Sequence, residues 1–278
     1  LPEGVSADQV VFVEPWGTDN AKRATELAKL NDLGNNSWVF FEPGEYNSTT
    51  FDIAFPEHVN FFGTKDTVFD SIIVYCRKIS TAIKSVDNTP SFQLNIQDIT
   101  VNCQTPNSSG IVFHSTKRTD GTVTEFANIT IKNCNFIDYA RIYPCTANVA
   151  NISIENCKFT LTKEVPGTAS QSVIFGPGKP ENFLAEDLKS FTVKNCVFES
   201  KVDSAEYSAK TCYYNAIQCG YMYSSTDITI EGNTFRNLVD RTINIPCAEV
   251  ESKPYGKWII KNNKFEDVKY HSYIKALS

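Results

Sequence analysis

The sequence predicts an all-β protein in which short parallel strands stack as a solenoid, the arrangement called a parallel β-helix. The first observation is that ITIKNCNF, which starts at Ile129, recurs little changed as four later octapeptides. These are ISIENCKF, FTVKNCVF, ITIEGNTF and WIIKNNKF, which start at Ile152, Phe191, Ile228 and Trp258. The second is that three short strand patterns, joined by variable loops and with no convincing helix, fill each unit from about Phe51 onward. Units repeating every 20–50 residues or so are typical of stacked repeat folds.

The N-terminal segment differs from the rest of the chain. TDNAKRATELAKL, Thr18 to Leu30, opens with helix-capping residues. Its periodicity places four residues on one helical face, namely Ala21, Ala24, Leu27 and Ala28. The following WVFFEPGEYN predicts a strand closed by a turn at Pro43–Gly44. An amphipathic helix before a repeat array is expected to cap the exposed end of its core. We therefore expect one domain, 1–278, with residues 1–50 as the N-terminal cap and first strand and 51–278 as the coils.

Within each octapeptide, apolar and polar residues alternate with a period of two. Ile129 and Ile131 are expected to point inward, and Thr130 and Lys132 outward. A tight turn follows, with Asn at the same place in four copies and Gly232 in the fifth, where a positive φ is required. Phe then points inward from the next strand. We take ITVNC, Ile99 to Cys103, as the first copy of the central strand, one residue shorter than the others.

Two further columns follow if equivalent residues stack on one another. Cys134, Cys157 and Cys196 hold the same place in three copies, which predicts a buried column of small, unbridged side chains. The nine cysteines include no CxxC pair or Cys–His cluster, so the sequence predicts no metal site and no cofactor. The outward charges alternate in sign from copy to copy. They are Lys132, Glu155, Lys194, Glu231 and Lys261. Opposite charges on neighbouring strands attract, which favours a device that sets strand register over a row that binds substrate.

Composition excludes several classes of partner. A net charge of −6 with no basic patch argues against nucleic acid as a ligand. No apolar run is long enough to span a membrane, so no membrane insertion is expected. The chain begins at Leu1 without a visible signal peptide, which suggests a processed start. The oligomeric state is left open.

The strand–Asn-turn–strand unit, the N-terminal helix and the PGEY segment at Pro43 resemble right-handed parallel β-helix proteins of the pectin-lyase-like superfamily. The resemblance covers nearly the whole chain. It implies a single-stranded right-handed parallel β-helix with an N-terminal capping α-helix. The superfamily includes pectate lyases, polygalacturonases, alginate lyases, phage tailspikes and adhesins, so it implies a polysaccharide or glycan partner without fixing the chemistry.

In that superfamily the usual active groove lies on the strand before the NCxF-bearing one. Here those strands read IVFHS, IYPCT, VIFGP, AIQCG and NIPCA. We expect two outward columns. One is Val112, Ile142, Val173, Ala216 and Asn244, and the other is His114, Pro144, Phe175, Gln218 and Pro246. Neither contains Asp, Glu, Lys or Arg, whereas glycoside hydrolysis uses a pair of carboxylates. Catalytic groups would have to come from the loops, so whether the protein is an enzyme stays open.

Aromatic residues indicate the candidate binding site instead. The stretch Tyr213 to Tyr223 surrounds one strand with tyrosines, and Phe175 lies on the preceding unit. The predicted substrate-binding residues are His114, Phe175, Gln218, Tyr221 and Tyr223. Aromatic faces beside amides suit sugars, although these rings equally suit packing of long loops. We expect a secreted, cell-surface or periplasmic protein that acts on or binds polysaccharide. The alternative is a structural or adhesive β-helix with a protein partner.

Overall fold

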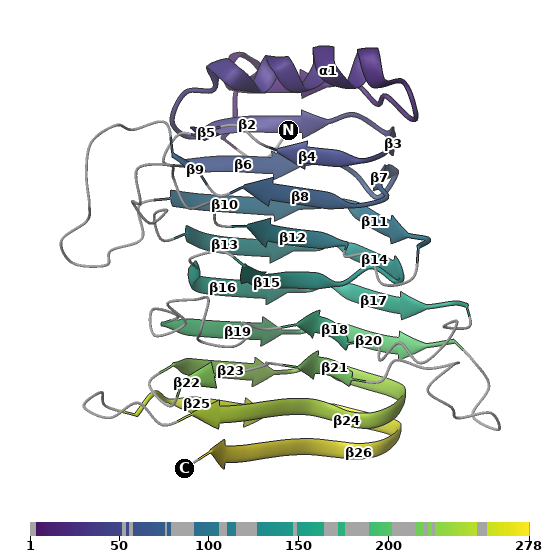
Figure 1. The fold of residues 1–278 in the computed structure, drawn as a ribbon, viewed down its shortest axis with the longest axis vertical. Coiled ribbons are helices and arrows are strands. Elements are labelled where there is room, and N and C mark those ends of the chain that lie inside the picture. The colour runs from purple at the N-terminus through teal and green to yellow at the C-terminus, as the bar shows by residue number, and fades with distance from the viewer. Residues whose placement is uncertain are drawn as a thin grey trace.

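The structure is a computed structural model of the chain. It describes residues 4–51, 54–55, 58–75, 77–78, 92–105, 110–114, 127–146, 149–163, 172–175, 189–201, 215–218, 222–223, 226–248 and 255–277. The described chain is all-β, with long parallel sheets and one short α-helix. The strands lie one above another from the end that carries α1 to the end that carries β26 (Figure 1). This arrangement is consistent with a β-helix solenoid.

Two parallel sheets contain nearly all the strands of the described residues. The nine-stranded sheet has the order β1 (Val10–Val13), β2 (Ser37–Phe41), β6 (His58–Phe62), β10 (Phe92–Gln97), β13 (Ala127–Lys132), β16 (Val149–Glu155), β19 (Ser190–Lys194), β23 (Asp227–Glu231) and β25 (Trp258–Lys261). The helical elements near its start are η1 (Ala7–Gln9), α1 (Asn20–Ala28) and η2 (Lys29–Asp32).

The fifteen-stranded sheet has two arms. We call β3 (Gly44–Tyr46), β7 (Thr67–Phe69), β11 (Thr100–Cys103), β14 (Asn135–Asp138), β17 (Lys158–Leu161) and β20 (Val197–Ser200) the second-strand arm. The third-strand arm is β4 (Thr49–Phe51), β8 (Ile72–Tyr75), β12 (Ile111–His114), β15 (Ile142–Thr146), β18 (Ser172–Phe175) and β21 (Asn215–Gln218). The long strands β24 (Thr234–Ala248) and β26 (Lys264–Leu277) run through both arms, and β22 (Met222–Tyr223) pairs with β24. A separate pair joins β5 (Ala54–Phe55) to β9 (Arg77–Lys78).

The stacking of like residues accounts for the repeated octapeptide. Each strand of one unit pairs in parallel with its counterpart in the next, as β13, β14 and β15 do with β16, β17 and β18. Phe136, Phe159, Phe198, Phe235 and Phe265 form a continuous stack, with neighbouring ring centroids 4.6, 4.7, 5.1 and 5.2 Å apart. One unit alone cannot cover its own apolar side, so each copy of the octapeptide buries the copy beside it.

The predicted turn is confirmed. The Asn residues at this corner have φ values of 52–55°, and Gly232 has a φ of 68°. The Asn members are Asn133, Asn156, Asn195 and Asn262. Their amides also contact one another: Asn156 Nδ2 donates to Asn133 Oδ1, 3.4 Å away. A Cβ on Gly232 would lie only 2.5 Å from Asn195 Oδ1, which is too close for a side chain. The close approach of the Asn195 amide therefore accounts for glycine at this corner.

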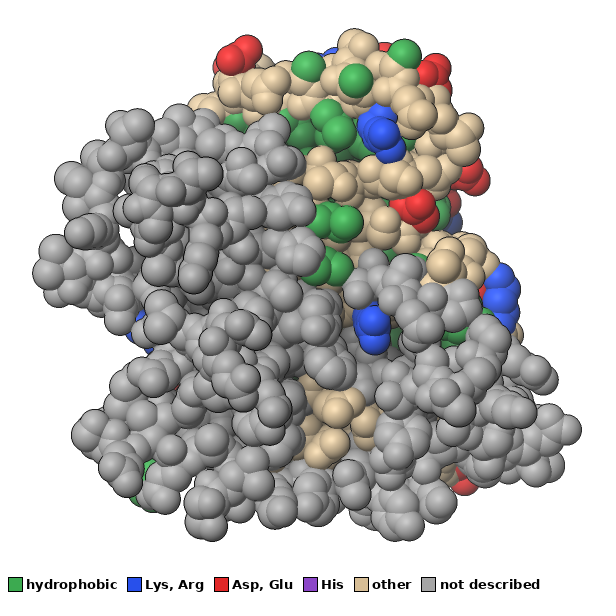
Figure 2. Space-filling model, viewed as in Figure 1, with side chains coloured by type: hydrophobic (Ala, Val, Ile, Leu, Met, Phe, Trp, Pro, Cys, Tyr) green, Lys and Arg blue, Asp and Glu red, His purple; other side chains and the backbone are tan. Residues whose placement is uncertain are grey.

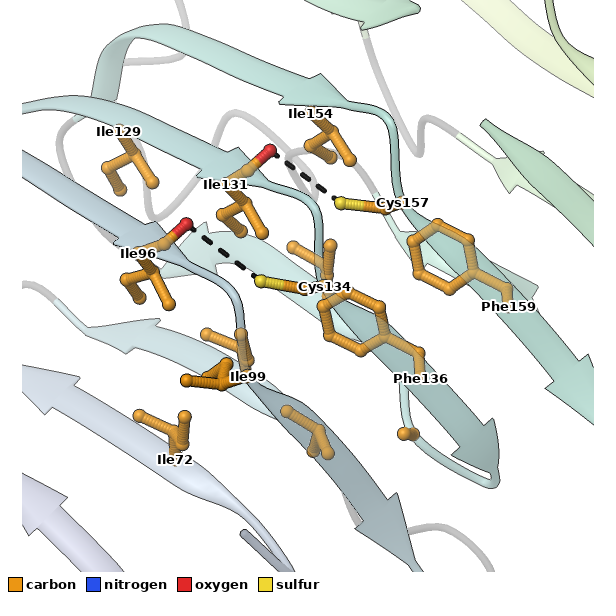
Figure 3. Packing of buried hydrophobic residues seen from close by; sticks show 14 of the residues in the cluster. Ile72, Ile96, Ile99, Ile129, Ile131, Cys134, Phe136, Ile154, Cys157 and Phe159 are labelled. Carbon is orange, nitrogen blue, oxygen red and sulfur yellow. Dashed lines mark hydrogen bonds between the residues drawn. The ribbon is translucent and has the colours of Figure 1, made fainter. Parts of the chain in front are cut away.

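The cysteine column is also confirmed, because Cys134, Cys157 and Cys196 are buried and unbridged. These thiols do more than fill space. The Sγ atoms of Cys134 and Cys157 lie 3.9 and 3.7 Å from the carbonyl oxygens of Ile96 and Ile131 in the preceding unit (Figure 3). Burial raises the pKa of the Cys134 thiol, which keeps it protonated and able to donate.

The assignment of ITVNC to the central strand is wrong. Thr100–Cys103 forms β11 of the second-strand arm and pairs with β14. The central strand of that unit is β10, which pairs with β13. Its turn carries Asp98, with a φ of 58°, in place of Asn. Ile99 and Val101 then stand where later units have Cys and Phe, so this copy lacks the residues that make the repeat visible.

The α-helix begins as expected, because the Asp19 carboxylate accepts hydrogen bonds from the backbone N–H groups of Ala21 and Lys22. Its alanine face, however, is exposed at Ala21, Ala24 and Ala28, and Leu27 is half-buried. The buried helical residue is Glu26, whose Oε2 accepts from Glu14 N at 2.7 Å and from Lys29 Nζ at 2.6 Å. A buried carboxylate is tolerated here because both a backbone donor and a cation satisfy it.

The alternating charges lie in one column, as predicted. Backbone register pairs Lys132 with Glu155, Glu155 with Lys194, Lys194 with Glu231, and Glu231 with Lys261. Ion pairs join Lys132 to Glu155 at 3.5 Å and Lys261 to Glu231 at 3.1 Å. A hydrogen bond from Ser153 and the neighbouring lysines lower the pKa of Glu155, so its charge persists into mild acid.

Reversing one charge in this column is expected to destabilise the fold. Lys194→Glu places a third acid between Glu155 and Glu231, and we expect the free energy of unfolding to fall by about 1 kcal/mol. The matched control is Lys194→Gln, which removes the attraction without adding repulsion and is expected to cost less. Urea unfolding at low and at high salt measures both. Equal losses for the two variants would show that the alternation does not set the register.

Candidate functional site

The predicted groove strands are present, but their register differs from the one expected. Backbone pairing aligns an unbroken series of isoleucines along the third-strand arm, formed by Ile72, Ile111, Ile142, Ile174, Ile217 and Ile243. All but Ile174, whose side chain lies outside the described burial, are buried. Ile142 was expected to point outward with Val112, but it is fully buried and pairs with Ile111. Ile142 faces inward because this register lets the β-branched Ile of one strand pack on the Ile of the next in the core.

This register aligns a second set of residues along the backbone, one place further along each strand, which we call the groove column. Its pairs are Val112 with Tyr143, Phe175 with Gln218, Gln218 with Asn244, and Asn244 with Tyr273. Tyr143 follows Ile142 as Phe175 follows Ile174, so the two segments are continuous. The groove column thus merges residues from both expected columns. Asn244 lies beside Gln218, and Pro246 does not.

The groove column contains aromatic and amide residues and no charged residue. Gln218 is half-buried, and its Oε1 accepts a hydrogen bond from Asn215 Nδ2 at 3.2 Å. Asn244 and Val112 are 9% and 8% exposed although each is flanked by core residues and faces away from the core. Amides shielded in this way from bulk water make stronger hydrogen bonds than fully exposed ones.

The structure brings two of the five predicted site residues together. Phe175 and Gln218 are adjacent in β18 and β21. His114 ends β12, where it pairs with Tyr75 and, after a register shift, with Thr146. Because β15 lies between β12 and β18, His114 is not beside Phe175. Tyr223 ends β22 and pairs with Ala248, four residues beyond Asn244 along β24. Tyr221 lies outside the described residues.

Sequence reasoning missed Tyr143, Asn244 and Tyr273 as members of one column. The last of these lies in β26, which begins as the strand expected to carry Phe265 and continues to Leu277. A signal was present in the sequence, because each strand of the third-strand arm from β8 onward, and β24 after them, contains an Ile that can be aligned with the Ile of the strand before it. On the face seen in Figure 2, described hydrophobic side chains follow one another from the α1 end toward the middle of the stack.

A charged cluster lies where the second-strand arm turns into the third-strand arm. Asp138, at the end of β14, is 2% exposed. Its Oδ1 accepts from the backbone N–H and hydroxyl of Thr162, at 2.9 and 2.6 Å. Its Oδ2 lies 3.3 Å from Gln104 Nε2 and 3.6 Å from Lys163 Nζ. Lys163 also contacts Gln104.

This cluster joins three successive units, since Gln104 follows β11 and Thr162 follows β17. A carboxylate has about four acceptor positions, and the Asp138 donors occupy that number. The arrangement therefore suits holding three corners in place better than accepting a proton from a substrate. Burial and the Asp138 charge raise the pKa of the neighbouring Tyr139, which keeps its phenol neutral.

Over the described ranges, no three His, Cys, Asp or Glu side chains come together as a metal ion would need. None of the described helices has the length and apolar character to cross a membrane.

Comparison with known proteins adds little to these observations. No protein-family model and no curated protein matches the chain. Among solved structures it is similar to one titled "Geobacillus virus E2 - ORF18", with 12% sequence identity and a TM-score of 0.33. The similarity covers 96% of this chain and 61% of that one, so this chain spans less than two thirds of its length. A likeness this distant carries no argument about function.

Proposed function

We propose that this protein is a polysaccharide-binding right-handed parallel β-helix of the pectin-lyase-like kind, capped by α1, and that glycan lies along the groove column. The observation that carries the proposal is the register that brings Phe175, Gln218 and Asn244 onto three neighbouring strands. The position of α1 at one end of the stack supports its role as a cap (Figure 1).

The chemistry of the groove column fits a sugar chain. Aromatic rings cover the apolar faces of pyranose rings, and amides both donate to and accept from their hydroxyl groups. Strands spaced about 4.8 Å apart offer a repeated set of such contacts along the stack. An uncharged column suits a neutral or weakly charged glycan. Because polysaccharides of this kind surround cells, we place the protein outside the cell or at its surface.

A polysaccharide panel tests this proposal and separates its two forms. Binding is measured for each polymer, together with release of unsaturated products and of new reducing ends. Binding alone identifies a binding module, whereas product formation identifies an enzyme whose catalytic groups lie on its loops. A protein that binds no polymer in the panel would favour the adhesive alternative with a protein partner.

With one ligand in hand, Phe175→Ala is expected to weaken glycan binding about tenfold, because loss of a stacked aromatic at a binding site commonly costs more than 1 kcal/mol. The control is Lys132→Gln. Lys132 lies on the outer side of the nine-stranded sheet, so its replacement is expected to leave binding unchanged. Melting curves check that both variants stay folded. If Lys132→Gln loses binding and Phe175→Ala keeps it, the site lies on the other sheet.

A further inference from the structure

The outer face of the nine-stranded sheet changes character toward the end that carries α1. In β13, β16 and β19 the outward positions form two columns, one of hydroxyl residues that begins at Thr130 and the charge column that begins at Lys132. In β1, β2 and β6, the last two of which lie near α1 in Figure 1, the same positions hold aromatic rings. These rings, which we call the outer aromatic cluster, belong to Phe12, Trp38, Phe40 and Phe62.

The rings face away from the core and hold one another in place. Each lies next to a core residue along its own strand. The ring centroids are 5.8 Å apart for Phe12 and Phe40, 5.0 Å for Phe40 and Phe62, and 5.5 Å for Trp38 and Phe62. Phe12 is 41% exposed, and Trp38 and Phe40 are half-buried. Since later strands of the same sheet pair without rings at these positions, strand pairing alone does not require the cluster.

Amide side chains continue the two columns from β6 into β10. Backbone register pairs Asn60 with Asn95 and Phe62 with Gln97. Two contacts hold the Asn95 amide, because its Nδ2 donates to Asn60 Oδ1 at 2.7 Å and lies 3.2 Å from His58 Nε2. Since an amide group is planar, these contacts also fix the direction of Asn95 Oδ1.

Three polar groups beside the rings have no hydrogen-bond partner in the described structure. They are Trp38 Nε1, Asn95 Oδ1 and the Gln97 amide. None of them is shielded from solvent. The other two indole groups are occupied, since Trp16 and Trp258 donate to backbone carbonyl oxygens at 2.9 and 3.1 Å. Uncharged donors and acceptors are therefore available to a ligand next to the outer aromatic cluster.

We propose that the outer aromatic cluster and its amides form a second carbohydrate site, which binds a neutral oligosaccharide. The rings cover the apolar faces of sugar units, Trp38 Nε1 donates to a hydroxyl group, and Asn95 Oδ1 accepts from one. The Gln97 amide does both. Neither column carries a charged residue from β1 to β10, which suits a neutral sugar. Because the rings and the Asn95 amide are already held in place, binding orders few side chains.

A proline-rich peptide fits this site less well. Such peptides also dock on aromatic side chains, and their carbonyl oxygens would accept from Trp38 Nε1. Proline has no N–H group, however, so a run of prolines offers no donor to Asn95 Oδ1. A sugar hydroxyl both donates and accepts, and it therefore satisfies all three groups.

The test follows the indole N–H signals of the full chain by NMR, with neutral hexasaccharides of glucose, xylose and mannose as probes. The chain has three tryptophans, and Trp38→Phe identifies the Trp38 signal by removing it. We expect at least one of these sugars, at millimolar concentration, to shift the Trp38 signal and to leave those of Trp16 and Trp258 in place. No shift of the Trp38 signal with any of them would overturn the proposal.

Variants of two asparagines supply the matched comparison, with melting curves to check folding. Asn95→Leu removes the fixed acceptor and is expected to weaken sugar binding at Trp38 about fivefold, as loss of one hydrogen bond does. Asn135→Leu makes the same change at a half-buried position of β14 and is expected to leave the affinity unchanged. Equal losses for the two variants would contradict the proposal. A proline-rich peptide that shifts the Trp38 signal where no sugar does would overturn it in favour of a peptide site.

This site and the groove column lie on different sheets, so either can fail without the other. Phe175→Ala is expected to leave the sugar titration at Trp38 unchanged. A sugar that shifts the amide signals of Asn215–Gln218 and not the Trp38 indole would overturn the second site and support the groove column.

Discussion

Replacing Phe159 with alanine is expected to lower the free energy of unfolding by about 3–5 kcal/mol. The ring is fully buried between Phe136 and Phe198, with centroids 4.6 and 4.7 Å away. Alanine at this place leaves a cavity in the middle of the stack and removes the contacts of two other rings. Since neighbouring units hold each other in place, the loss is felt on both sides.

The control for this prediction is Phe12→Ala. Phe12 also contacts a phenylalanine, Phe40, at 5.8 Å, but it is 41% exposed. Its loss is expected to cost no more than about 1 kcal/mol, because little area returns to water. Urea unfolding followed by fluorescence and circular dichroism compares the two variants. A similar loss for both would mean that the phenylalanine stack does not hold the units together.

Asn233→Ala is expected to cost about 3 kcal/mol. Asn233 is 1% exposed and takes the place that cysteine occupies in three earlier units. Its Oδ1 accepts from Cys196 N at 2.9 Å, and its Nδ2 donates to Val193 O and to Asn263 Oδ1, each at 3.0 Å. Alanine leaves the buried Cys196 N–H and Val193 C=O without this partner, and a buried N–H or C=O left without one costs roughly 1–3 kcal/mol.

The graded control is Asn233→Cys, which restores the residue of the earlier units. A thiol at this place donates weakly to the preceding carbonyl, as Cys196 does to Ile154 at 3.6 Å. We expect an intermediate loss of stability, because the thiol replaces only one of the three side-chain hydrogen bonds of Asn233. If Asn233→Cys is as damaging as Asn233→Ala, a thiol at this place contributes nothing to stability.

Much of the fold followed from residues that neighbour one another along the chain. The alternation of Ile129 and Ile131 with polar residues fixed which side of the strand is buried, because side chains in a strand alternate. The Asn turn followed from the same reasoning, since few residues other than Asn and Gly adopt a positive φ without strain. The charge column followed once identical strands were taken to stack.

The candidate site was harder to predict, because it depends on register between strands far apart in sequence. The Ile111 and Ile142 pair is an example. Local alternation allows either residue of an aliphatic pair to face inward, and the loops between these strands vary in length. A shift of one residue reverses every side chain, which is how Ile142 was placed on the wrong side.

The sequence by itself determined the repeated unit, its inward and outward faces, and its turn. Those depend on backbone geometry over a few residues. Only the tertiary structure decided that Thr100–Cys103 belongs to the second-strand arm, that the alanine face of α1 is exposed, and that Asn244 lies beside Gln218. Each of these depends on which buried surfaces fit together across the core, and packing between distant segments leaves no mark in a short stretch of sequence.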